Sequence, residues 1–262
     1  MENTFNEIFR VYGKIGVLTR SGLAAIWLLL FLIFWFLSPI KALPYPQEVL
    51  SAIYNMWAKY QLLSHVGITI KLNVVGLFYS SIISLLISYL SIIPFFRPLN
   101  KTVQILRYIP IVGFTLVFLS LFAIGWPTKV AMLTTGMSFF LVTSMTAAIE
   151  SIPQMKYELA RVLGYSDWQV FYTVVLRPML PQMIDMIAQN AAIGWVMITA
   201  IETYNRTEGG IGSQIYAYSS TNNLPEVYGL LIIIGVIALI EDWIFLILKR
   251  TLFPYSTIAE KG

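Results

Sequence analysis

The sequence predicts an all-α membrane protein with about six transmembrane helices. Of its 262 residues, 58% are hydrophobic and only 11% are charged, whereas soluble domains carry about 25% charged residues. So few charges cannot cover the surface of a soluble globule of this length. The chain also contains repeated apolar runs of the roughly 20 residues that a helix needs to cross a bilayer.

Six apolar segments have suitable length and composition. They lie at about residues 22–38, 66–93, 108–124, 130–149, 183–203 and 227–248. The first is longer than the core of a signal peptide and lacks a good cleavage site, so we interpret it as a retained anchor. The third is bounded by the turn-forming Gly125-Trp126-Pro127. We therefore predict an N-terminal segment 1–21 and one transmembrane domain over 22–262.

The distribution of basic residues predicts the orientation of these spans. If the N-terminus is cytoplasmic, 12 of the 17 Lys and Arg residues lie in loops on the cytoplasmic side. This asymmetry agrees with the positive-inside rule. Six spans then place both termini in the cytoplasm, and the net charge of +4 reflects membrane topology rather than nucleic-acid binding.

The stretch 150–182 is the longest connection predicted to lie inside. Residues 158–163 have helical composition, and Gly164 provides a stop because glycine readily adopts the left-handed conformation that ends helices. A second short helix follows, with Ser166 or Asp167 as its cap.

This second helix carries apolar side chains on one side, including Trp168 and Phe171. We expect Pro178 and Pro181 to end it before the fifth span begins. Short helices with apolar projections at a membrane face suit docking into the groove of another protein. They also suit packing against their own bundle, and the residues alone leave both interpretations open.

The same stretch resembles the EAA loop of binding-protein-dependent ABC importer permeases. In that pattern Glu-Ala-Ala is followed by a glycine six residues after the Glu and then, nine residues on, by Ile-x-Leu-Pro. The matching positions are Glu158, Ala160, Gly164, Val174 and Leu176. The sequence departs from the pattern at Leu159, which replaces an alanine, and at Arg177, which stands where the first proline is expected.

Further matches extend the resemblance over about residues 40–255. They lie in order at 43–49, 106–110, 194–202 and 210–212. The subgroup with these stretches imports nitrate, sulfonates, taurine and related small anions or heterocycles, which leaves the solute itself open.

The resemblance implies a type I importer permease fold with a cytoplasmic coupling helix in a bacterial cytoplasmic (inner) membrane. Two copies, expected to be identical, would form the pathway through the lipid bilayer, and a solute-binding protein would deliver cargo outside. Separate ATPase subunits would bind ATP and Mg²⁺. The implied ATPase-coupling residues are Glu158, Ala160, Arg161, Gly164, Tyr165, Asp167, Phe171 and Leu176.

The chain itself lacks the motifs of an enzyme or a metal site. It has no cysteine, a single histidine and no G-x-x-x-x-G-K-[ST] phosphate loop. We therefore expect no catalytic residue, no metal ligand and no cofactor in this chain, and we expect ATP hydrolysis in a partner.

Polar residues within the spans are the remaining candidates, because ionisable groups in a membrane are costly. Trp195, Thr199 and Glu202 of the fifth span are candidate pathway or gate residues. Glu202 either gates the pathway, binds Arg206 in the following loop, or is an interfacial carboxylate. Glu241 is expected to pair with a basic residue of a neighbouring element or to lie near the inner interface.

Small polar residues recur in the second and fourth spans, including Ser84 and Ser138. They either line a pathway or allow close helix packing. From the residues alone, a stand-alone secondary transporter or channel is the alternative function. It would require coupling charges within the membrane or inverted repeats, and the sequence contains no visible repeat.

Overall fold

The computed structural model describes residues 16–38, 42–59 and 62–254, so most of the predicted N-terminal segment 1–21 lies outside the described residues. Within these ranges the chain is helical and has no strand. The α-helices are α2 (Val17–Leu37), α3 (Pro46–Lys59), α4 (Leu62–Leu90), α5 (Arg97–Leu106), α6 (Thr115–Leu121), α7 (Trp126–Glu150), α8 (Gln154–Val162), α9 (Asp167–Val170), α10 (Arg177–Tyr204), α11 (Ile211–Ser220) and α12 (Leu224–Leu252).

Five helical segments of the described chain are long and apolar enough to cross a membrane. They are Leu18–Leu37, Leu62–Leu90, Trp126–Glu150, Asp167–Tyr204 and Leu224–Leu252. Each overlaps one of the predicted spans, because hydropathy over about 20 residues is a strong local signal.

The predicted third span, 108–124, is not one helix. The chain instead forms a 3₁₀ turn, η2 (Ile111–Phe114), followed by the seven-residue helix α6. The helical pair 94–106 and 111–121 is bent by 98°. Pro110 explains the break, because it has no backbone N–H and disfavours helical conformation in the residue before it. The described chain therefore has five long spans, or six if the bent pair counts as one.

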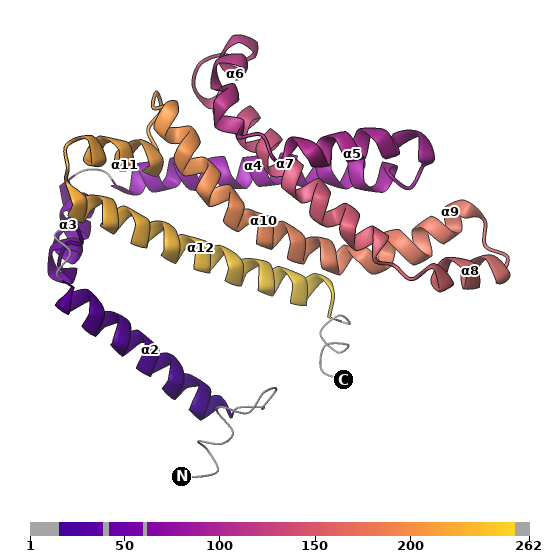
Figure 1. Ribbon diagram of the computed structural model, residues 1–262, viewed down its shortest axis with the longest axis horizontal. Helices are drawn as coiled ribbons and strands as arrows, with labels where there is room; N and C mark the ends of the chain where they lie inside the picture. Colours follow the sequence, from indigo (N-terminus) through magenta and orange to yellow (C-terminus); the bar gives the residue numbers. More distant parts are fainter. Residues whose placement is uncertain (1–15, 39–41, 60–61, 255–262) are drawn as a thin grey trace.

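The centre of the bundle is formed by α4, α7 and α10, which lie against one another (Figure 1). The hydroxyls of Ser84 and Ser88 on α4 donate to the carbonyls of Ser138 and Val142 on α7, at 3.3 and 3.4 Å. At Gly76 a Cβ atom would overlap the side chain of Leu133.

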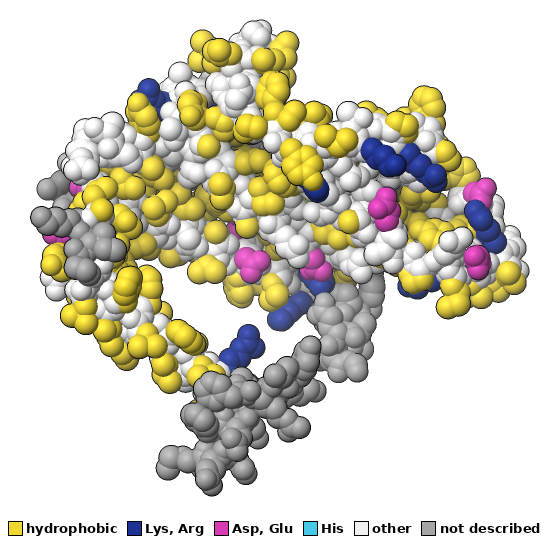
Figure 2. Space-filling view, viewed as in Figure 1, with side chains coloured by type: hydrophobic (Ala, Val, Ile, Leu, Met, Phe, Trp, Pro, Cys, Tyr) yellow, Lys and Arg dark blue, Asp and Glu magenta, His cyan; other side chains and the backbone are white. Residues whose placement is uncertain are grey.

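Helices α3 and α11 and the starts of α4 and α12 form a smaller apolar cluster at one end of the bundle. Met56, Leu62, Ile211 and Leu230 are buried there. Helix α2 lies apart from the bundle (Figure 1), and none of its apolar span is buried within the chain. Hydrophobic side chains cover much of the visible surface, as expected for a protein in contact with lipid (Figure 2).

Candidate functional site

The loop between α7 and α10 contains the predicted helix–glycine–helix arrangement. Helix α8 ends in a turn in which the N–H of Tyr165 donates to the carbonyl of Ala160 at 3.2 Å and the N–H of Gly164 donates to that of Arg161 at 2.9 Å. This is the pattern of a Schellman turn, which requires a left-handed residue. Gly164 has φ +81°, so the glycine stop is confirmed.

The second short helix begins where the sequence predicted. The N–H of Ser166 donates to Oε1 of Gln169 at 2.8 Å, which is one half of a capping box at the start of α9. Gly164 and this cap together fix the angle between α8 and α9.

The expected end of this helix at Pro178 and Pro181 is wrong. Helix α9 continues through a π-helical turn, η3 (Phe171–Leu176), directly into α10. A proline ring normally clashes with the carbonyl four residues earlier. A turn with i→i+5 bonds displaces that carbonyl, which allows a continuous helix from Asp167 to Tyr204.

The predicted coupling residues divide into an exposed group and a packed group. The exposed side chains are Glu158, Arg161, Tyr165 and Asp167, and Gly164 is exposed between them. Arg161 Nη2 lies 3.5 Å from Asp167 Oδ1, which bridges α8 and α9 across the turn. Ala160 is buried, whereas Phe171 and Leu176 are half-buried, and Phe171 packs against the buried cluster that includes Val175 and Met179.

The same loop exposes large apolar side chains that the motif did not identify. Those on and after α8 are Met155, Leu159, Val162 and Leu163, and Trp168 follows on α9. Val162 is 83% exposed. The sequence signal for this surface is Val162 and Leu163, two large apolar residues directly before Gly164. Tyr157 of α8 packs against the bundle, and this burial raises the pKa of its phenol.

At the opposite end of α10, Glu202 is fully buried in a network of hydrogen bonds. Its carboxylate accepts from the hydroxyl of Thr69 on α4 at 2.9 Å and from the N–H of Gly212 on α11 at 2.8 Å. Of the three alternatives for Glu202, pairing with Arg206 is wrong, since the Arg206 guanidinium lies over the ring of Tyr216, 4.2 Å from its centroid. Glu202 therefore ties three helices together.

A second buried charge, Lys129 on α7, lies at the same end and was not singled out from the sequence. Its Nζ donates to the carbonyl of Gly209 at 3.1 Å and lies 4.0 Å from Glu208 Oε2. His65 Nδ1 accepts from the N–H of Gly210 at 3.2 Å. The turn over 205–212 is thus fixed to α4 and α7 by side chains that are far from it in the sequence.

The other predicted α10 residues face different surroundings. Trp195 is buried, and its indole N–H donates to Glu241 Oε2 on α12 at 2.6 Å. Glu241 also accepts from Asn73 Nδ2 at 2.9 Å, so its described partners are polar groups of α4 and α10. Thr199 is half-buried and its hydroxyl donates to the carbonyl of Val196 at 2.8 Å. The pathway roles of Trp195, Thr199 and Glu202 remain predictions.

Comparison with known families decides which class of protein has these features. The sequence profile described as "Binding-protein-dependent transport system inner membrane component" matches residues 94–254, which is more than half of the chain. The chain belongs to this family. The family predicted from the sequence is confirmed, and the protein is a permease of an ABC importer.

Two curated relatives agree with this assignment. The permease is 22% identical over 222 residues to the putative aliphatic sulfonates transport permease protein SsuC of Bacillus subtilis, covering 83% of this chain and 79% of the relative. It is 23% identical over 157 residues to the taurine transport system permease protein TauC of Escherichia coli, covering 60% of this chain and 57% of the relative.

Solved structures confirm the predicted fold class. The permease matches a chain of the MetNI methionine ABC transporter in an inward-facing conformation with TM-score 0.62 and 20% identity, covering 75% of this chain and 96% of that one. It matches a chain of a bacterial ABC transporter for the acidic polysaccharide alginate with TM-score 0.58 and 16% identity, over 90% and 96%. At these identities the matches establish the fold alone.

Proposed function

We propose that this permease imports a small anion and that separate ATPase subunits drive it through the loop 150–182. The observation that carries the proposal is the set of exposed apolar side chains on both sides of the turn at Gly164, with Val162 and Leu163 before it and Trp168 after it. Exposed apolar side chains on short, rigid helices are typical of a surface that enters a partner's groove.

The continuity of the helix after α9 gives this surface a mechanical role. A force applied at Asp167 acts on a helix that reaches Tyr204 at the other end of the bundle. When two ATPase subunits bind ATP and Mg²⁺ and close, movement of α8 and α9 would tilt α10. Glu158, Arg161, Tyr165 and Asp167 would contact the ATPase, whereas Ala160, Phe171 and Leu176 would transmit the movement.

The pathway is proposed to lie along the open face of α10. Gln189, Ala192 and Val196 are exposed at helical spacing, and Thr199 lies at the edge of this face. A second, identical copy of the permease would close the pathway from the other side. Trp195 and Glu202 would hold α10 in place from behind through their buried hydrogen bonds, so that changing either side chain would alter the gate indirectly.

The family supports a bacterial inner membrane and the proposed partners, and the distribution of basic residues supports the orientation. Both termini would be cytoplasmic in a bacterial inner membrane, with the loop 150–182 facing the ATPase. A solute-binding protein would dock on the outer face near residues 204–226. The names of SsuC and TauC favour a sulfonate or taurine as the solute; nitrate is the third candidate, because a nitrate import permease of Synechocystis is also similar, at 22% identity. A small heterocycle remains the alternative class of solute.

Val162→Glu tests the docking surface. It places a charge on the most exposed apolar side chain of α8, and Ser220→Glu places the same charge on an exposed site at the other end of the bundle. Each variant would be purified with candidate ATPase subunits from the same genome, and ATPase recruitment and ATP hydrolysis would be measured.

We expect Val162→Glu to reduce recruitment by about tenfold or more, since desolvating an unpaired carboxylate in an interface is costly. Ser220→Glu should leave recruitment unchanged. Equal recruitment by both variants would show that the ATPase binds elsewhere. Movement of taurine by the purified permease alone, driven by an ion gradient, would contradict the importer mechanism itself.

A further inference from the structure

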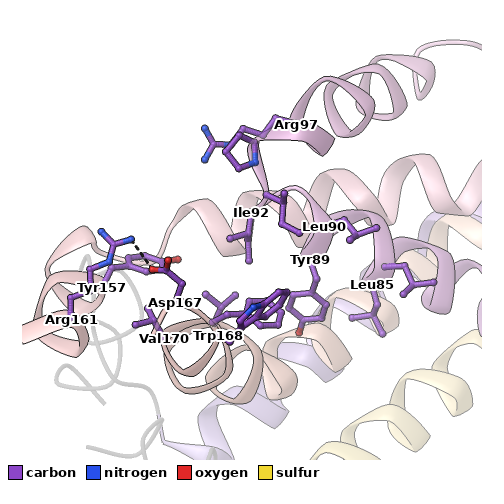
Figure 3. A pocket seen from close by; sticks show the side chains of 15 residues that line it. Leu85, Tyr89, Leu90, Ile92, Arg97, Tyr157, Arg161, Asp167, Trp168 and Val170 are labelled. Carbon is purple, nitrogen blue, oxygen red and sulfur yellow. Dashed lines mark ion pairs between the residues drawn. The ribbon is translucent and has the colours of Figure 1, made fainter. Parts of the chain in front are cut away.

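A cleft of about 690 Å³ separates the end of α4 from the coupling segment α8–α9–η3. Its walls are mainly apolar, with Leu86 and Leu90 on the α4 side and Val170 and Phe171 on the other. Figure 3 shows Arg97 on one rim and the Arg161–Asp167 ion pair on the other. The cleft is therefore an apolar space with charged edges.

A second, polar compartment adjoins the first. It has a volume of about 630 Å³ and shares Ile92, Arg97, Tyr157 and Arg161 with the apolar one. Lys101 and Glu150 lie among its remaining lining residues. A molecule that fills both spaces must have an apolar part and a polar part that are covalently joined.

The charges of the two compartments favour an anionic polar part. Three cations, Arg97, Lys101 and Arg161, face two carboxylates, those of Glu150 and Asp167. Asp167 is already paired with Arg161 at 3.5 Å. Neither Arg97 nor Lys101 belongs to any ion pair formed between described residues. Exposed and without a described carboxylate partner, these two side chains can bind a phosphate through charge-assisted hydrogen bonds.

The position of the cleft identifies the source of such a molecule. It opens where the 29-residue apolar helix α4 ends at Leu90. Tyr89 and Trp168 are joined through Phe171, whose ring centroid lies 5.7 and 6.1 Å from theirs. Aromatic and basic side chains at the end of a span are typical of the level of lipid headgroups. An acyl chain can enter the apolar compartment directly from the bilayer.

We propose that this cleft binds an anionic phospholipid, with its phosphate at Arg97 and Lys101 and an acyl chain between α4 and the coupling segment. The lipid would occupy the space beside Trp168 and Phe171. Phe171 also contacts α4 directly, through its edge-to-face pair with Tyr89. A filled cleft supports α9 and η3 against α4, so lipid composition would influence how firmly the coupling segment is held.

Lipid binding to the intact permease provides the test. The protein would be purified in detergent and delipidated, and native mass spectrometry would measure binding of dioleoyl phosphatidylglycerol, dioleoyl phosphatidylethanolamine and inorganic phosphate. Arg97→Gln removes the proposed phosphate ligand, and Leu86→Trp fills the apolar compartment. The matched controls are Arg107→Gln and Val236→Trp, at residues outside both compartments.

We expect phosphatidylglycerol to bind more tightly than phosphatidylethanolamine. Arg97→Gln should weaken its binding by about tenfold, Leu86→Trp should prevent it, and the two controls should bind like the unmodified permease. Equal binding of the two lipids, equal losses in the controls, or binding of inorganic phosphate as tight as that of the lipid would overturn the proposal. Release of the lipid when an ATPase is added would assign the cleft to the ATPase. None of these readouts depends on ATP-driven transport.

Discussion

Replacing Glu202 with alanine should destabilise the isolated permease by about 2–4 kcal/mol. The substitution leaves the N–H of Gly212, now 2.8 Å from the carboxylate, buried without an acceptor, at a cost of about 1–3 kcal/mol. The lost hydrogen bond from Thr69 costs less, because its hydroxyl can still donate to the carbonyl of His65, which lies 3.2 Å away. Loss of the buried Cγ methylene and carboxylate leaves a cavity that costs about 1 kcal/mol more.

Unfolding in detergent by added SDS, followed by tryptophan fluorescence, would give the free-energy difference. Glu158→Ala is the matched control, since this exposed glutamate should contribute within about 0.5 kcal/mol of zero. Glu202→Gln keeps the shape and one acceptor oxygen and should cost only about 1 kcal/mol. If Glu202→Ala and Glu158→Ala unfold alike, the carboxylate does not hold α4, α10 and α11 together and the reasoning fails.

Three further changes test other contacts. Gly210→Ala should cost about 2 kcal/mol or more in the same unfolding assay, because Gly210 has φ +112° and a Cβ there overlaps the buried carboxylate of Glu202. Its control, Gly67→Ala, lies in open space on α4 and should be neutral or slightly stabilising. Trp195→Phe should cost about 1–3 kcal/mol by removing the 2.6 Å hydrogen bond to a carboxylate of α12, whereas Trp243→Phe, at a residue 61% exposed, should cost less than about 0.5 kcal/mol. In Gly164→Ala the added Cβ meets no neighbouring atom, but the alanine must adopt a left-handed conformation at a cost of about 1 kcal/mol. ATP hydrolysis by the bound ATPase should therefore fall severalfold. Membrane insertion, measured by fractionation, should be unchanged.

The features that the sequence predicted correctly depend on local chemistry. Five long spans follow from hydropathy, and the turn between α8 and α9 follows from Gly164 and Ser166, whose backbone preferences act over four or five residues. The importer family could be recognised for the same reason, since the loop motif is a short and ordered pattern.

The features that the sequence did not predict depend on neighbours that are distant along the chain. Helix α10 continues past Pro178 because a π-helical turn precedes it, and no local rule distinguishes this from a helix end. For Glu202 the sequence offered the nearby Arg206 as one possible partner, but Thr69, 133 positions away, donates to its carboxylate instead. Lys129 looked like an ordinary loop cation, although its side chain is fully buried and bonded to Gly209.

The two candidate regions lie at opposite ends of one helical segment, and this arrangement restricts how coupling can work. Asp167 to Tyr204 comprises 38 residues, or about 57 Å of helix at 1.5 Å per residue. Glu202 fixes the far end to α4 and α11, whereas the near end carries the exposed surface at Trp168. A displacement of that surface must therefore rotate the segment about its fixed end or bend it. The weakest place for bending is between Phe171 and Pro181, where π-helical bonding and two prolines remove regular backbone hydrogen bonds. We infer that movement of the loop 150–182 would displace the part of α10 near Pro178 while the end at Tyr204 stays in place.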